Sequence, residues 1–148
     1  MMTTLPNYMV NPRQVHSPQP SYSHVCVAPI GDGVKLVTIA GQIGKHPETG
    51  EIPPTFAAQV DLALENVGRC LREVQADIKD IVRVQQFIVN LSSPDSTRVQ
   101  AYLRFMGDHR PPSTVIGVQA LAQKELLYEI EVTALARTSI SADPNNDE

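Results

Sequence analysis

Apolar residues recur with a helical period over residues 55–76. Six of them are separated by four, four, three, four and three positions: Phe56, Val60, Leu64, Val67, Leu71 and Val74. This spacing puts them on one face of an α-helix, and Thr55 is suited to cap its first turn. A second helix is predicted from Ser93-Pro94, with the serine as cap and the proline in the first helical position, to about Met106, before Gly107.

The remaining ordered segments have the composition of β-strands, at residues 22–28, 34–43, 81–91, 114–121 and 126–136. Gly31-Asp32-Gly33 is a turn signal that predicts a hairpin between the first two strands, and 44–54 is predicted to be a loop. The order ββαβαββ is typical of an α+β fold with both helices packed on one face of the sheet. Because two helices leave the other face uncovered, we expect an oligomer.

The two ends of the chain differ from this pattern. Residues 1–20 are rich in proline and polar side chains without a sustained period, which predicts an extended arm. Residues 138–148 are predicted to form a disordered acidic tail. A single domain is therefore expected over residues 21–137.

Composition and charge disfavour nucleic-acid-binding, membrane-spanning and secreted proteins. The 148 residues are 42% apolar and 19% charged, as in globular proteins, and the net charge of -4 disfavours nucleic-acid binding. No apolar run approaches the ~20 residues that span a bilayer, and the first residues do not have the pattern of a secretion signal. We therefore expect a cytoplasmic protein that binds neither membrane nor nucleic acid.

The cysteines and histidines do not have metal-binding spacing. Cys26 and Cys70 lack a CxxC arrangement, and the four histidines are scattered along the chain. We expect two reduced, mostly buried thiols, no metal and no cofactor.

Glu129 is the first candidate for chemistry. In the predicted strand at 126–136, Glu129 and Glu131 share one side, whereas Tyr128, Ile130 and Val132 point the other way. A carboxylate in a partly apolar strand can have a raised pKa and act as a general acid or base, or position a water. The spacing alone equally allows Glu129 and Glu131 to lie on a solvated face or to pair with nearby Arg or Lys side chains.

Ser113 and Thr114 follow Pro111-Pro112, and the two prolines fix the backbone. The Ser113 and Thr114 hydroxyls and the backbone groups around Val115 can therefore be presented to a ligand in a set geometry. The alternative is a plain strand entry. Arg110 is a basic group near this segment and can equally be a surface charge.

Gly41-Gln42 ends a strand, and the glycine permits close approach of a ligand or another backbone. The alternative is a bulge or strand terminus. Tyr22 can donate its hydroxyl to a ligand or serve in packing.

Several fragments, in this order and spacing, resemble the RidA/YjgF family of enamine/imine deaminases over about residues 20–137. The matching fragments are Tyr22-Ser23, 39–43 (IAGQI), Thr49-Gly50-Glu51, Ala58-Gln59, 64–67 (LENV), 80–82 (DIV), 102–105, 111–114 and Glu129-Ile130-Glu131.

The resemblance implies a YjgF-like (chorismate-mutase-like) α+β subunit that forms a homotrimer, with the sheets lining a central barrel and ligand clefts between subunits. It implies hydrolysis of small imines or enamines without a cofactor. Glu129 matches the family's water-linked glutamate, and Tyr22 matches its pocket tyrosine. Nucleic-acid cleavage, proposed for some relatives, fits poorly with this acidic chain.

The sequence departs from the family pattern at three positions. Ser113 stands where the family has the arginine that holds a substrate carboxylate, Ala40 replaces a serine, and Val99 replaces an asparagine found in some members. Serine cannot make the two-point charged contact of arginine. Arg110, three positions before Ser113, is a candidate to replace the missing arginine, but nothing in the sequence requires this role.

Three hypotheses follow. The first is hydrolytic deamination of a small, less anionic reactive intermediate in an intersubunit cleft. The second is an acid/base isomerase, cyclase or dehydratase of a biosynthetic pathway that uses the same carboxylate. The third is a trimer that binds a metabolite without turnover.

Overall fold

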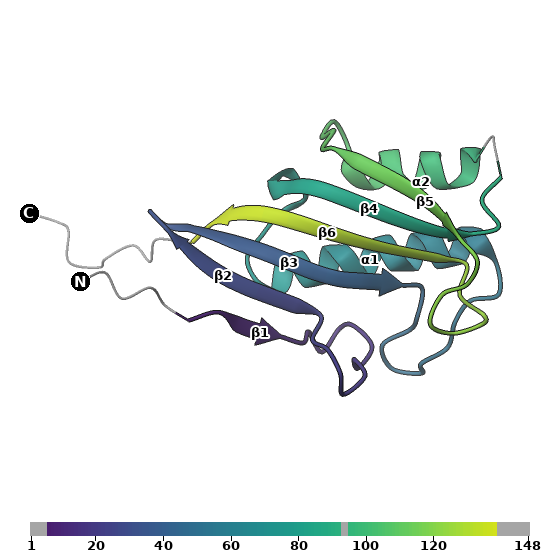
Figure 1. The fold of residues 1–148 in the computed structure, drawn as a ribbon, viewed down its shortest axis with the longest axis horizontal. Coiled ribbons are helices and arrows are strands. Elements are labelled where there is room, and N and C mark those ends of the chain that lie inside the picture. Colours follow the sequence, from purple (N-terminus) through teal and green to yellow (C-terminus); the bar gives the residue numbers. More distant parts are fainter. Residues whose placement is uncertain (1–5, 93–94, 139–148) are drawn as a thin grey trace, which may run out of the picture.

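The computed structural model describes residues 6–92 and 95–138, which form one mixed six-stranded sheet with two α-helices on one side (Figure 1). The strands are β1 (Tyr8–Val10), β2 (Val25–Gly31), β3 (Val34–Ile43), β4 (Ile81–Val89), β5 (Ser113–Val118) and β6 (Tyr128–Arg137). The helices are α1 (Phe56–Glu73), the 3-10 helix η1 (Ile78–Asp80) and α2 (Ser96–Met106).

The strand order across the sheet is β1-β2-β3-β6-β4-β5. Only β4 and β5 are parallel; the other neighbouring pairs of the described sheet are antiparallel. The predicted hairpin of β2 and β3 is present, and Gly31, Asp32 and Gly33 all have positive φ angles in its turn. Glycine adopts such angles without strain, which explains why this sequence turns here.

Both helices lie on the same face of the sheet, as predicted, and the α+β architecture is confirmed (Figure 1). Helix α1 begins after Thr55, whose side chain accepts a hydrogen bond from the Ala58 amide. It packs on β3 and β6 and buries the apolar stripe that the sequence predicts. Lys35, itself buried, donates from Nζ to the Val74 carbonyl at 2.5 Å and so caps the C-terminal end of α1.

Within the described residues, no helix covers the opposite face, which we call the open face. Its members alternate with core residues along three strands: Leu36 and Thr38 of β3, Arg83, Gln85 and Phe87 of β4, and Glu129, Glu131, Thr133 and Leu135 of β6. As predicted, Glu129 and Glu131 share a face, and Tyr128, Ile130 and Val132 are buried on the other.

The N-terminal arm is more ordered than the sequence analysis anticipates. Tyr8–Val10 forms an edge strand against β2, and Val15 and His16 are buried against the domain. The first predicted strand starts at Val25 and not at Tyr22, so Tyr22 belongs to the segment that leads into β2.

The start of the second helix was predicted wrongly. Asp95 is its N-cap and accepts from the Arg98 amide, and the helix begins at Ser96. Ser93 and Pro94 lie outside the described residues. The predicted end at Gly107 is confirmed, with a positive φ at that glycine.

The C-terminal tail expected at 138–148 lies outside the described residues except for Thr138, whose amide donates to the Gly33 carbonyl at 2.7 Å. Cys70 is buried, Cys26 is half-buried, and both thiols are free. None of the described helices is long and apolar enough to cross a membrane.

Candidate active site around Glu129

A β-bulge in β3 prepares the space for Glu129. Ile39 pairs with Val132 and Gln42 with Ile130, so β3 has one extra residue at Ala40-Gly41. A Cβ atom built on Gly41 would fall 2.6 Å from Cδ and 2.8 Å from Cγ of Glu129 and would overlap the carboxylate. The bulge and the missing side chain at position 41 together let the carboxylate lie against the backbone.

The surroundings of Glu129 favour its protonated form. Burial raises the pKa of this carboxyl above its ordinary value, and the like charge of Glu131 raises it further. A half-buried carboxyl with a raised pKa is better suited than a solvated one to accept and return a proton near neutral pH.

Tyr22 lies near enough to Glu129 for the carboxylate charge to act on its phenol. Burial raises the pKa of its phenol, the backbone hydrogen bond with Gln19 opposes this, and the charge of Glu129 raises the pKa again. The phenol therefore stays protonated at neutral pH and can donate a hydrogen bond. Gly41 and Glu129, two of the residues selected from the sequence, are thus in contact, and Tyr22 is within electrostatic reach of them.

A buried histidine pair holds the arm beneath this site. His24 Nε2 faces the His16 carbonyl at 2.6 Å, and its Nδ1 faces the Gln42 amide nitrogen at 3.1 Å. The His24 backbone amide donates to Asn11, and the His16 and Tyr22 rings both contact the His24 ring edge-to-face. These contacts fix the position of Tyr22.

Gln42, a predicted substrate-binding residue, lies inside the protomer. It is fully buried, and its amide nitrogen lies against His24 and donates to the Ala40 carbonyl at 3.0 Å. It therefore supports the bulge from inside, where a ligand on the open face does not reach it.

Glu131, next to Glu129 on the open face, belongs to a polar row across β6 and β4. The Gln85 side chain lies between Glu131 and Arg83 and hydrogen-bonds to both when its amide nitrogen points to Glu131 and its oxygen to Arg83. Thr114 pairs with Gln85 and therefore lies on the same face.

Ser113 lies on the other face of the sheet, at the end of a hydrogen-bonded chain. Arg98 Nη1 donates to Gln86 Oε1 at 3.3 Å, and Tyr128 Oη donates to the same oxygen at 2.9 Å. Gln86 Nε2 then donates to Ser113 Oγ at 3.2 Å. The arginine that these hydrogen bonds connect to Ser113 is thus Arg98 of α2.

Arg110 is exposed, and its Nη1 donates to the Gly107 and His109 carbonyls of its own loop. Val115 pairs with Gln86 and packs against the core. Within one protomer, Glu129 therefore lies over Gly41, Thr114 lies on the same face of the sheet two strands away, and Ser113 and Val115 lie on the opposite face.

Arg98 and Gln86 were not predicted from the sequence. Gln86 left a signal, because a polar residue stands at a core position of the apolar strand β4. The pairing of Arg98 with Asp95 also had a signal, the three-residue spacing that puts both on one face at a helix start.

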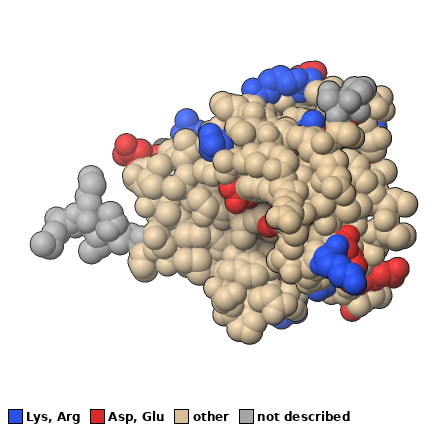
Figure 2. All heavy atoms as spheres, turned by 45° about the vertical axis from the view of Figure 1, so that its right-hand side comes forward, with Lys and Arg blue, Asp and Glu red and all other residues tan. Residues whose placement is uncertain are grey.

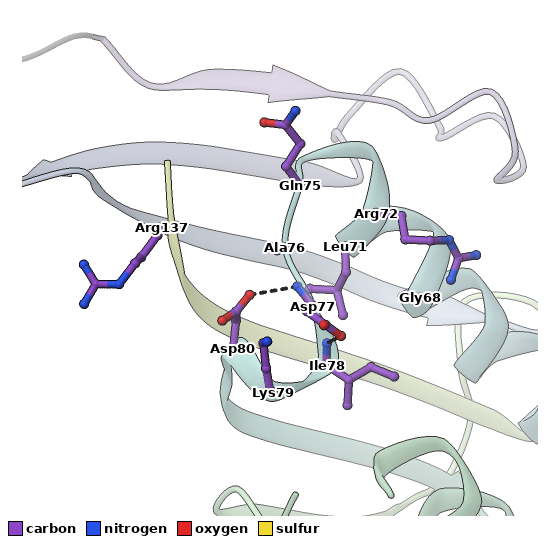
Figure 3. A pocket seen from close by; sticks show the side chains of 10 residues that line it. All are labelled: Gly68, Leu71, Arg72, Gln75, Ala76, Asp77, Ile78, Lys79, Asp80 and Arg137. Carbon is purple, nitrogen blue, oxygen red and sulfur yellow. Dashed lines mark hydrogen bonds between the residues drawn. The ribbon is translucent and has the colours of Figure 1, made fainter. Parts of the chain in front are cut away.

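A hollow of about 740 Å³ lies elsewhere, at the C-terminal end of α1. Asp77 and Asp80 there form a capping box of η1, and Arg72 and Arg137 extend away from each other (Figure 3). None of the predicted site residues lines it, and its two aspartates are engaged in the capping box, so we assign it no chemistry.

Figure 2 shows acidic atoms in a hollow near the middle of a surface whose neighbouring residues carry no charge. A depression of about 430 Å³ on the open face is lined by residues that include Cys26, Thr38, Ala40, Glu131 and Thr133. The Glu131 carboxylate therefore borders a depression that a small molecule can approach.

Comparisons with known proteins identify the family. The family model described as endoribonuclease L-PSP matches residues 14–136. The 2-iminobutanoate/2-iminopropanoate deaminase of Escherichia coli K12 is 32% identical over 118 residues, which cover 75% of this chain and 90% of that protein. A RutC family protein of Pyrococcus abyssi is 29% identical over 113 residues, 73% of this chain and 87% of that protein.

A solved structure supports the same relationship. The crystal structure of E. coli TdcF with bound serine superposes with a TM-score of 0.75 at 26% identity, over 87% of this chain and 98% of that one. The chain therefore belongs to the endoribonuclease L-PSP family, in which the RidA/YjgF deaminases are its relatives.

Proposed function

We propose that this protein hydrolyses a small imine or enamine to a carbonyl compound and ammonia, without a cofactor, and that Glu129 handles the proton. The observation that carries the proposal is the half-buried carboxyl of Glu129, with a raised pKa, seated on Gly41 within electrostatic reach of Tyr22. The similarity to a 2-iminobutanoate/2-iminopropanoate deaminase supports the reaction class.

The chemistry needs one group that accepts and returns a proton. The Glu129 carboxylate takes a proton from water as the water oxygen bonds to the imine carbon, and the C=N π electrons move to nitrogen. The same carboxyl then gives that proton to the nitrogen, which yields a carbinolamine. In a second relay the carboxylate takes the carbinolamine O–H proton and passes it to the nitrogen, so that the C=O bond forms as the C–N bond breaks and ammonia leaves. Glu129 ends in its starting state, and the Tyr22 phenol donates a hydrogen bond to the reacting centre.

The cleft would lie between subunits of a homotrimer. Glu129 and Ser113 are on opposite faces of one sheet, so one protomer does not bring their side chains together. A neighbouring copy packed on the open face would place a second subunit's Ser113 face near Glu129 and cover exposed apolar side chains such as Leu135. Analytical ultracentrifugation of the full chain checks this, and a monomer at micromolar concentration would contradict it.

The function is tested by measuring ammonia release from a panel of imines and enamines generated in situ, with wild type and Glu129→Ala. We expect wild type to accelerate release from at least one compound and the variant to lose this acceleration. Consumption of substrate without ammonia, lost in the variant, would favour the isomerase, cyclase or dehydratase alternative. Binding without turnover of any compound would favour the metabolite-binding alternative.

A further inference from the structure

We propose that Ser113, positioned by Gln86 and Arg98, recognises the non-reacting end of the substrate, and that this end is an uncharged carbonyl group, as in an amide or ester. The inference rests on the proposed function, because it assigns the substrate class of the same site. It also identifies Arg98 and Gln86 as positioning residues.

The charge of Arg98 is already neutralised within the protein. Arg98 Nε donates to Asp95 Oδ2 at 2.6 Å, and the two side chains are only 12% and 13% exposed. Asp95 is also held in place as the N-cap of α2. A buried, geometrically tight pair of this kind has no net charge to offer a substrate carboxylate, and a second carboxylate nearby would be repelled by Asp95.

The directions of the hydrogen bonds around Gln86 determine where the Ser113 proton points. Arg98 can only donate, and Tyr128 Oη donates to the same Gln86 oxygen, so the orientation of the buried Gln86 amide is fixed. Its nitrogen must then face Ser113, whose oxygen accepts. The Ser113 proton is left to point outward, where the side chain is exposed.

Among the described residues, the Ser113 hydroxyl donates no hydrogen bond. The Tyr102 hydroxyl is close, and Ser113 lowers its pKa although burial raises it more strongly. That oxygen nevertheless has no partner with hydrogen-bonding geometry among the described residues. Ser113 therefore presents a single neutral donor, which suits one carbonyl oxygen and cannot replace the two-point contact of a guanidinium with a carboxylate.

The test compares matched neutral and anionic ligands of one carbon skeleton. Steady-state kcat and KM are measured for the imines of an amino-acid amide and of the corresponding amino acid, and calorimetry measures binding of the related 2-oxo amide and 2-oxo acid. Wild type is expected to favour the amide in both assays by about tenfold. Ser113→Arg is expected to reverse the preference.

Asp95→Asn tests the positioning role, because asparagine still caps the helix but leaves Arg98 unpaired. It is expected to lower KM for the acid imine and the Kd of the 2-oxo acid by about fivefold, with kcat and thermal stability little changed. Arg104→Gln is the matched control, since Arg104 lies on α2 in a largely exposed pair with Asp61. It is expected to change neither preference.

The binding arm separates the two proposals. If neither imine is turned over but the 2-oxo amide binds more tightly than the 2-oxo acid, the reaction is wrong and the subsite stands. Tighter binding of the acid by wild type, binding of neither compound, or an unchanged preference in Ser113→Arg would overturn the subsite.

Discussion

The Glu129 carboxylate lies on the α-carbon of Gly41, in the space that any side chain at position 41 would fill. The relationship connects two strands, because the bulge of β3 supplies the space and the alternation of β6 supplies the carboxylate. The Glu129 carboxylate can keep this position only if residue 41 is a glycine.

We therefore expect Gly41→Ala to destabilise the protein, because the new methyl group would clash with Glu129. The Cβ overlaps the carboxylate, and the strain should cost about 1–3 kcal/mol in the free energy of unfolding. Denaturant unfolding of a double-mutant cycle checks this, since the same substitution in a Glu129→Ala background should cost much less.

Gly117→Ala is the matched control for this cycle. Its Cβ would meet Leu91 at an ordinary 3.4 Å, so the substitution should be nearly neutral. Equal costs of Gly41→Ala with and without the Glu129 side chain would refute the relationship.

Glu129→Gln is expected to raise the melting temperature at pH 8 and to have little effect at pH 4. The folded-state pKa of Glu129 is raised by burial and by Glu131, so ionising it costs stability once the pH exceeds that pKa. At low pH the carboxyl is already neutral and resembles the amide. Differential scanning fluorimetry at both pH values measures the effect, and a lower melting temperature at pH 8 would speak against a raised pKa.

His16 should make the protein less stable in mild acid. Burial lowers its pKa from 6.5 to about 4, with smaller contributions from His24 and Lys45, so between these values the unfolded chain binds a proton that the folded chain does not. Stability is therefore full above pH 6.5 and falls as the pH drops toward 4. The lowered pKa of His24 acts in the same direction, and the raised pKa of Glu129 opposes it.

His16→Phe isolates this contribution, because the aromatic ring is kept and the titration removed. Urea unfolding at pH 7 and pH 4.5 should show a smaller loss of stability for the variant than for wild type. Parallel losses in both proteins would show that His16 does not set the acid limit.

Lys35→Met should destabilise the end of α1. The buried ammonium donates to the Val74 carbonyl, and its loss leaves that acceptor without its charged donor, at a cost of about 1–3 kcal/mol. Lys79→Met, at an exposed position just beyond the same helix, is the control and should be nearly neutral. Similar urea midpoints for the two variants would contradict the capping role.

Local patterns predicted most of the fold. The strand at 34–43 coincides with β3, and the helix at 55–76 contains α1, because hydrophobic period and capping are local properties. Strand β1 escaped prediction because three residues carry no usable alternation, and only pairing with β2, distant in the sequence, makes them a strand. Ser93 and Asp95 are both good caps, so local chemistry does not choose between them.

The candidate site was predictable in part for the same reason. The alternation of β6 placed Glu129 beside Glu131, and the glycine at 41 indicated close approach. The burial of Gln42 under His24 and the connection of Arg98 to Ser113 through Gln86 depend on contacts between distant segments. No spacing in the sequence specifies such contacts.

The central claim is that Glu129, and not its neighbour Glu131, moves the proton. The most direct measurement is the rate of ammonia release from one accepted imine by wild type, Glu129→Gln and Glu131→Gln at equal folded concentration. The account predicts a loss of about 100-fold or more for Glu129→Gln and of less than about tenfold for Glu131→Gln. Equal losses in the two variants, or full activity in Glu129→Gln, would contradict it.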